Sequence, residues 1–244
     1  MAEERLDKLL VSTGRWSRSE VRRLVREGRV LVDGCVAARP EEKYDAQRVA
    51  LSVDGAAVPL RAHVYIMLNK PDGTLSATED GRGKTVLDLL PPEYQKRGLF
   101  PVGRLDKDTE GLLLLTDDGA LAHALLAPKK HVDKRYLARV DGPLSEADRE
   151  AFAGEMTLED GLHCLPAALE IVSSGEAESA ATVTLHEGKF HQIKRMFAAR
   201  GRRVTYLKRL SMGPLALDAS LAPGEWRLLT DSEENTITGH FAQE

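Results

Sequence analysis

A polar loop between two glycines carries the densest group of residues that can do chemistry. Residues 103–111 contain three acids and two bases: Asp106, Asp108, Glu110, Arg104 and Lys107. The apolar run 112–116 follows at once and predicts a buried strand. A carboxylate on a loop that a core strand fixes is well placed for catalysis, and its ionisation is coupled to that of its neighbours. The same residues also suit a solvated turn in which aspartates support backbone hydrogen bonds.

The cysteines do not indicate a metal centre. Cys35 and Cys164 lie far apart in the sequence and form no C-x-x-C pair. Neither a zinc site nor a disulfide framework is therefore predicted, and both residues are interpreted as small, partly buried apolar side chains. We expect no metal site elsewhere in the chain.

The sequence around the polar loop, which must position it, alternates between segments that predict strands and segments that predict helices. Strands are predicted at 64–68, 112–116, 135–140, 181–185 and 204–207. Helices are predicted at 120–126, stopping at Pro128, and from Ser145 to Phe152. A third helix, ending at Gly201, would place Phe190, Ile193 and Phe197 in the core, with Lys194 at the border of that apolar stripe. Consecutive strands without regular crossovers predict an α+β fold with a mixed, mainly antiparallel sheet.

The N-terminal quarter reads as a separate small unit. Residues 6, 9 and 10 have helical spacing, and Ser17 with Glu20 forms a capping-box pattern that begins a second helix. Gly28 is placed to end that helix. The Asp33-Gly34 pair between the apolar runs 30–32 and 35–36 predicts a tight hairpin. Residues 37–62 predict one or two strands and a linker, so the expected domains are residues 1–60 and 61–244.

The charge of the chain is unevenly distributed. The formal net charge is −4, yet residues 189–209 hold eight Lys or Arg and no acid. Residues 15–29 and 127–139 are also basic, whereas residues 144–178 hold nine acids against one arginine. Phosphate binding depends on the local field, so this polarised surface suits RNA. Taken alone, any one basic stretch is better explained as a solvated helix face.

The N-terminus and the hydropathy pattern predict a cytoplasmic protein. The first ten residues lack the basic region and apolar run of a signal peptide, and no apolar stretch reaches membrane-spanning length.

The first sixty residues resemble the S4 (α-L) RNA-binding domain. The resemblance is carried by two short helices, a hairpin, and the segments RLDKLL and RVLVDG. It implies a set of RNA-facing residues: Arg5, Lys8, Ser17, Arg18, Arg22 and Arg26. Arginines along one ridge can hold phosphates through paired hydrogen bonds, which makes this implication physically reasonable.

The rest of the chain resembles the pseudouridine synthases in four ordered segments. These are GRLDKDTEGLLLLT at 103–116, LNKPDG at 68–73, KRY at 134–136 and GKFHQIKRM at 188–196. The resemblance implies that Asp106 is the catalytic residue, that Tyr136 lies against the target base, and that Lys194 pairs with Asp106. It further implies that no metal or cofactor takes part. Arg104, Lys189 and Arg195 are expected to contact RNA.

The S4-like start and the HQIKRM segment resemble the RsuA-like branch, and within it the small-subunit (16S) rRNA enzyme. Lys189 departs from the arginine that is usual in this branch, and a lysine cannot make the same paired contact. The implied partner is ribosomal RNA or a pre-ribosomal small-subunit particle, and we expect a monomer. Asp106 can act as a nucleophile at C1′ or as a base on the sugar, and the sequence favours neither.

Three alternatives remain open from the sequence. The same reaction on 23S rRNA is one, and a non-catalytic S4-type ribosome-assembly factor is another. A glycosidase is a weaker interpretation because a second carboxylate with a matching motif is missing. His191 is interpreted as a packing or RNA-contact residue without a catalytic role.

Overall fold

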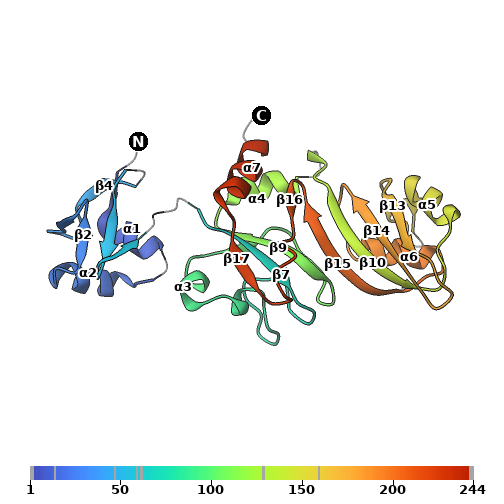
Figure 1. Cartoon of the computed structure of the whole chain (residues 1–244), viewed down its shortest axis with the longest axis horizontal. Coiled ribbons are helices and arrows are strands. Elements are labelled where there is room, and N and C mark those ends of the chain that lie inside the picture. The colour runs from blue at the N-terminus through green and yellow to red at the C-terminus, as the bar shows by residue number, and fades with distance from the viewer. Residues whose placement is uncertain are drawn as a thin grey trace. The chain divides into compact units, whose positions relative to one another are not determined.

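The computed structural model describes residues 3–13, 15–46, 48–58, 60, 63–127, 130–158 and 160–241. The contacts within the chain define two compact units (Figure 1). The first is Met1–Val64 with Leu90–Leu99, and the second is Tyr65–Leu89 with Phe100–Glu244. The boundary predicted between residues 60 and 61 stays a prediction, since Arg61 and the next residue lie outside the described part.

The first unit consists of short helices and two small antiparallel sheets. Its helices are α1 (Leu6–Ser12), α2 (Arg18–Arg26) and α3 (Pro92–Gln95). One sheet has the order β3-β2-β5-β6, formed by Cys35–Val36, Val30–Val32, Leu51–Val53 and Ala56–Val58. The other pairs β1 (Glu3–Arg5) with β4 (Lys43–Asp45). The predicted hairpin is confirmed, whereas β1 was not expected from the sequence.

Local signals explain the helices of the first unit. The Ser17 hydroxyl accepts from the Glu20 backbone N–H at 3.3 Å, and the Glu20 carboxylate accepts from the Ser17 N–H at 2.7 Å. This is the predicted capping box. Gly28, which follows the C-cap residue Glu27 of α2, has φ +70°, a conformation that glycine adopts without strain. The apolar faces of α1 and α2 share one buried cluster with the strands, which stabilises the unit.

The second unit is built on a large mixed sheet. Among the described residues nine strands form it, with β13-β14-β10-β15-β9-β7-β17 as its main path, β16 beside β15 and β8 beside β9. In chain order these are β7 (Tyr65–Lys70), β8 (Phe100–Pro101), β9 (Glu110–Thr116), β10 (Lys134–Asp141), β13 (Ala168–Ser173), β14 (Glu178–Leu185), β15 (Val204–Met212), β16 (Leu215–Ala216) and β17 (Trp226–Leu228). Within this sheet, as far as the structure describes it, β9 and β15 are the one parallel pair, so the predicted mainly antiparallel sheet is confirmed.

Short elements complete the second unit. They are η1 (Leu87–Leu89), α4 (Gly119–Leu126), α5 (Glu146–Ala153), α6 (Gln192–Ala199), α7 (Asp231–Phe241), and the two-stranded pair β11 (Met156–Thr157) and β12 (His163–Cys164). The predicted helices are confirmed, and the expected stop at Pro128 lies outside the described residues. In the part of the chain that is described, no helix is long and apolar enough to cross a bilayer.

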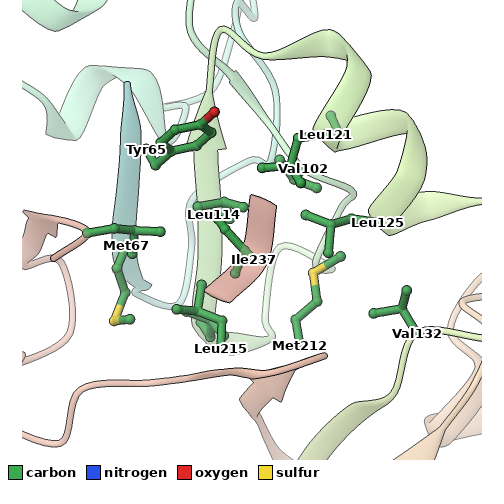
Figure 2. Close-up of a cluster of buried hydrophobic side chains, with 13 residues drawn as sticks. Tyr65, Met67, Val102, Leu114, Leu121, Leu125, Val132, Met212, Leu215 and Ile237 are labelled. Atoms are coloured by element: carbon green, nitrogen blue, oxygen red, sulfur yellow. The ribbon is translucent and has the colours of Figure 1, made fainter. Parts of the chain in front are cut away.

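Two apolar centres hold the sheet and its helices together. Figure 2 shows the first, in which Met67 and Leu114 from neighbouring strands lie with Leu121 of α4 and Ile237 of α7. At the other end of the sheet Phe152 of α5 meets Phe197 of α6, with ring centroids 4.8 Å apart. Both of these rings are fully buried. The sheet is therefore a rigid platform for the polar loop that enters β9.

The structure corrects two expectations. Phe190 was expected in the core beside Ile193 and Phe197, but it precedes α6 and its side chain is 73% exposed. The reason is that His191, with φ +52°, breaks the helical phase before α6 begins. Cys35 is exposed, whereas Cys164 is buried as expected, and both are free thiols.

Candidate active site

The loop that precedes β9 is held by hydrogen bonds from the end of β7 and from the segment that follows it. The Lys70 ammonium donates to the backbone oxygens of Lys107 and Thr109, at 3.0 and 2.9 Å, and to that of Pro71 at 3.0 Å. The Gly73 N–H donates to the Lys107 oxygen at 3.0 Å. The Ser76 hydroxyl donates to the Leu105 oxygen at 3.0 Å and accepts from the Leu105 N–H at 3.1 Å. Carbonyls on both sides of Asp106 are thus fixed.

Lys70 is the least expected of these contacts. Its side chain is fully buried at the end of the buried strand β7, and burial lowers its pKa to about 8 despite the attraction of nearby carboxylates. An ammonium group has three N–H donors, and the three carbonyls use all of them. In the sequence, Lys70 stands out only as part of the LNKPDG segment. Its position two residues after the apolar run 64–68 was the signal that it is buried.

Replacing Lys70 by Met should change how stability depends on pH. The Lys70 pKa falls from 10.5 when exposed to about 8 when folded, so between these values the unfolded chain binds more protons. Stability of the wild type should therefore rise with pH across this window, and the Met variant lacks this contribution. The wild-type advantage in free energy of unfolding should grow by about 3 kcal/mol from pH 8 to 10.5. Urea unfolding at several pH values measures it, and a constant difference would contradict the burial of this amine.

Asp106 shares a lysine with its neighbour Asp108. The Lys194 ammonium lies 3.0 Å from one carboxylate oxygen of Asp106 and 2.5 Å from one of Asp108. The side chains of Asp106 and Lys194 are only 25% and 22% exposed, whereas that of Asp108 is 67% exposed. The paired lysine lowers the pKa of Asp108. Burial alone would lower the pKa of Lys194, but the two carboxylates outweigh it and raise that pKa, so the lysine stays charged.

Two further side chains complete the surroundings of these carboxylates. The His191 Nε2 lies 3.6 Å from the other oxygen of Asp106, a contact that sequence analysis did not foresee. The third acid of the loop, Glu110, accepts from the Tyr206 hydroxyl at 2.8 Å. Burial, followed by this carboxylate, raises the pKa of Tyr206 to about 12. Asp106 therefore contacts both Lys194 and His191.

The carboxylate of Asp106 opens onto a cleft with a volume of about 790 Å³. Tyr136 of β10, 8% exposed, lines the same cleft, as do Lys134 and Arg209. Tyr136 and Arg209 are cross-strand partners between β10 and β15. The Arg209 Nε donates to the Leu112 oxygen at 2.7 Å, which ties this strand pair to β9. Burial, with the charge of Arg209 next, lowers the pKa of Lys134.

The other residues predicted to contact RNA differ in their surroundings. Arg104 is exposed on the rim of the cleft. Lys189 lines the cleft too, but its ammonium lies 2.8 Å from a Glu187 carboxylate oxygen. Arg195 lies at a neighbouring hollow and pairs with Asp160.

The first unit supplies the remaining candidates, considered by themselves. Arg18, Arg22 and Arg26 are exposed along α2 and, being four residues apart, share one face of the helix. Arg5 pairs with Asp7 at 2.8 Å and Lys8 with Glu4 at 2.5 Å. Ser17 is occupied as the helix cap described above. The α2 arginines therefore form the accessible basic ridge of this unit.

The side chains of this site suit chemistry by a single carboxylate. Within the described residues, no group of three or more His, Cys, Asp or Glu side chains is arranged to hold a metal ion. A partly buried, lysine-paired carboxylate that shares an open cleft with an aromatic ring can act on a flat ring compound bound against that ring.

Comparison with known proteins assigns both units. Residues 64–199 match the RNA pseudouridylate synthase family, and residues 4–47 match the S4 domain. A Bacillus subtilis (strain 168) protein named an uncharacterized RNA pseudouridine synthase is 48% identical over 94% of this chain and 96% of its own length. The ribosomal small subunit pseudouridine synthase A of Vibrio cholerae is 39% identical over 96% of this chain and 99% of its own length.

A solved structure agrees with these sequence relatives. A crystal structure of a pseudouridylate synthase, 33% identical in sequence, covers 96% of this chain and 99% of its own, with a TM-score of 0.66. The Escherichia coli (strain K12) ribosomal small subunit pseudouridine synthase A is 36% identical over 94% of this chain and 97% of its own length. The chain therefore belongs to the RNA pseudouridine synthases, enzymes that isomerise uridine to pseudouridine in RNA, and carries an S4 domain ahead of its synthase domain.

Proposed function

We propose that this enzyme isomerises a specific uridine in 16S rRNA, with Asp106 as the catalytic carboxylate. The observation that carries the catalytic assignment is the pairing of Asp106 with Lys194, at 3.0 Å, in the cleft that Tyr136 also lines. The 16S target is supported by the HQIKRM segment and by the names of the relatives from Vibrio cholerae and Escherichia coli. The fitting partner is 16S rRNA itself or a pre-ribosomal small-subunit particle in the cytoplasm.

The reaction breaks the bond between N1 and C1′, turns the uracil and joins C5 to C1′. Nothing is oxidised, and the product has the same atoms as the substrate. C5 gives up a proton when it bonds to C1′, and N1 gains one. The target uridine must leave its stack to reach Asp106. Tyr136 then holds the uracil by ring stacking, a contact worth about 1–3 kcal/mol. Asp106 acts on the sugar, as a nucleophile at C1′ or as a base.

In this proposal Lys194 orients the catalytic carboxylate and supplies the positive charge beside it. Its raised pKa means that it carries its charge through the neutral range. A fixed cation beside a reacting carboxylate acts in a partly dehydrated site, where electrostatic interactions are stronger than in water. Arg104, on the rim of the cleft, contacts the RNA near the position that the flipped uracil has left. The exposed ridge of Arg18, Arg22 and Arg26 holds phosphates. Arg5, Lys8 and Ser17 are proposed to face the RNA as well.

Replacing Lys194 by Met should lower the rate of the chemical step by about 10²-fold, since one stabilising charge is removed. Lys194→Arg should retain most of the activity because the cation is kept, and it serves as the matched control. Single-turnover measurement of pseudouridine formation separates this effect from RNA binding. Equal losses in both variants would mean that the lysine acts through its shape and not through its charge.

The substrate is tested by mapping the product. The purified protein is incubated with 16S rRNA, both free and in partly assembled particles, and with 23S rRNA, and pseudouridine is located by carbodiimide primer extension. One new stop on 16S rRNA is expected. A stop on 23S rRNA alone would replace the proposed substrate, and RNA binding without any stop would favour a non-catalytic assembly factor.

A further inference from the structure

Phe190 is the most exposed of the large apolar side chains in the described chain, at 73%. Leaving an aromatic ring in water forgoes the free energy of its burial, so a solvated phenylalanine at a functional cleft indicates a partner. Its ring stacks on the imidazole of His191, with centroids 3.8 Å apart and planes 19° from parallel. His191 therefore covers one face of the Phe190 ring, and the opposite face and the edge are exposed to solvent.

This stacked pair is held in place on both sides. His191 adopts φ +52°, an uncommon conformation for a residue other than glycine, and its Nε2 lies 3.6 Å from Asp106. The Phe190 backbone oxygen accepts from Arg195 at 3.5 Å, and Arg195 is itself paired with Asp160. An anchored aromatic ring loses little conformational freedom when a ligand stacks on it.

Phe190 also lies at the border of two hollows. It lines the cleft that contains Asp106 and Tyr136, and it lines a second hollow of about 420 Å³. The other described residues that line this second hollow are Leu158, Asp160, Arg195, Ala198 and Ala199. Its size lies within the range of small-ligand pockets. Phe190 lines both hollows, so an extended ligand that occupies both would pass over its ring.

The charges around the pair favour a nucleic-acid chain over an apolar protein segment. The described residues that line the cleft beside the pair include two acids, Asp80 and Asp106, and five cations: Arg104, Lys107, Lys134, Lys189 and Arg209. The acid described at the second hollow, Asp160, is already paired with Arg195. A basic surface that displays one flat aromatic ring is the arrangement by which proteins hold unpaired RNA, with cations on the phosphates and a ring under the base.

We propose that Phe190, backed by His191, is a stacking site for the base of the nucleotide next to the target uridine. While the uridine lies against Tyr136 in the first hollow, its neighbour lies on Phe190 toward the second. The site thereby holds an unpaired RNA segment by two rings instead of one. This inference rests on the proposed function only for the identity of the RNA.

The test measures binding and product together for three variants of Phe190. Phe190→Ala removes the ring, Phe190→Leu keeps an apolar side chain without a ring, and Phe190→Trp enlarges the ring. Affinity for 16S rRNA transcript is measured by filter binding, and pseudouridine formation by single-turnover assay. Val172→Ala is the matched control, because Val172 is 64% exposed in the same unit and lines none of the hollows described above.

Loss of stacking should weaken RNA binding by about 5- to 150-fold in both Phe190→Ala and Phe190→Leu. Phe190→Trp and Val172→Ala should bind as the wild type does, and stacking of a base should quench the new tryptophan. Wild-type affinity in the Leu variant, or an unquenched tryptophan with RNA bound, would overturn the stacking site and leave an apolar protein contact as the explanation of the exposed ring.

The two proposals fail in different ways. If the wild type modifies 16S rRNA while the Ala and Leu variants bind and react normally, the stacking site is wrong and the function stands. If 16S rRNA remains unmodified but the Ala and Leu variants bind it more weakly, the substrate is wrong and the stacking site stands. If the wild type binds neither 16S nor 23S rRNA transcript, both proposals are wrong.

Discussion

Asp106→Asn is expected to abolish pseudouridine formation, with a rate loss of at least about 10³-fold. Asparagine has nearly the same shape, and its side-chain oxygen can still accept from Lys194, which lies 3.0 Å from Asp106. It cannot carry the negative charge that both a nucleophile and a base require. Affinity for rRNA should change little, because binding depends mostly on contacts to phosphates. Single-turnover assay and filter binding with the same RNA measure the two quantities.

Asp108→Asn is the matched control for this prediction. Asp108 contacts the same lysine at 2.5 Å, lies in the same loop and loses the same charge, but its side chain is 67% exposed. Its replacement should leave most of the activity, since Lys194 keeps its contact with Asp106. A fully active Asp106→Asn variant would refute the proposed mechanism, and an inactive Asp108→Asn variant would make the pair of carboxylates the catalytic unit.

Gly111→Ala is expected to have the largest effect on stability. Gly111 has φ +99°, and a Cβ there would lie 2.3 Å from the backbone oxygen of Arg209 and 2.7 Å from its nitrogen. Both atoms belong to the backbone of β15 where it pairs in parallel with β9. The clash with them therefore cannot be relieved by moving a side chain. Strain and forced separation of the strands should cost about 3–5 kcal/mol. Urea unfolding monitored by circular dichroism measures the loss.

The same substitution should also reduce activity, for a geometric reason. Arg209 is the cross-strand partner of Tyr136, and β9 carries the loop that contains Asp106. Separating β9 from β15 therefore moves the ring away from the carboxylate. Gly119→Ala is the control, because nothing lies within 4 Å of its added Cβ and it begins α4. It should be neutral or slightly stabilising. If Gly111→Ala and Gly119→Ala were equally stable, β9 and β15 would have to move apart at position 111 without cost, which would contradict the prediction.

The sequence by itself determined the features that depend on neighbours in the chain. The capping box of Ser17 and Glu20, the Asp33-Gly34 hairpin and the buried strand at 112–116 all formed as predicted. Each arises from hydrogen bonds or apolar periodicity within a few residues. The motifs nominated Asp106, Tyr136 and Lys194 by resemblance, and their catalytic roles remain proposals.

Only the tertiary structure decided the features that depend on distant contacts. The buried ammonium of Lys70 under the loop of Asp106, the parallel pairing of β9 with β15 and the need for glycine at position 111 all join segments far apart in the chain. Sequence periodicity placed Phe190 in the core, whereas one backbone conformation at His191 turned its ring to solvent. Such outcomes depend on the packing of the whole sheet, which no local pattern of residues encodes.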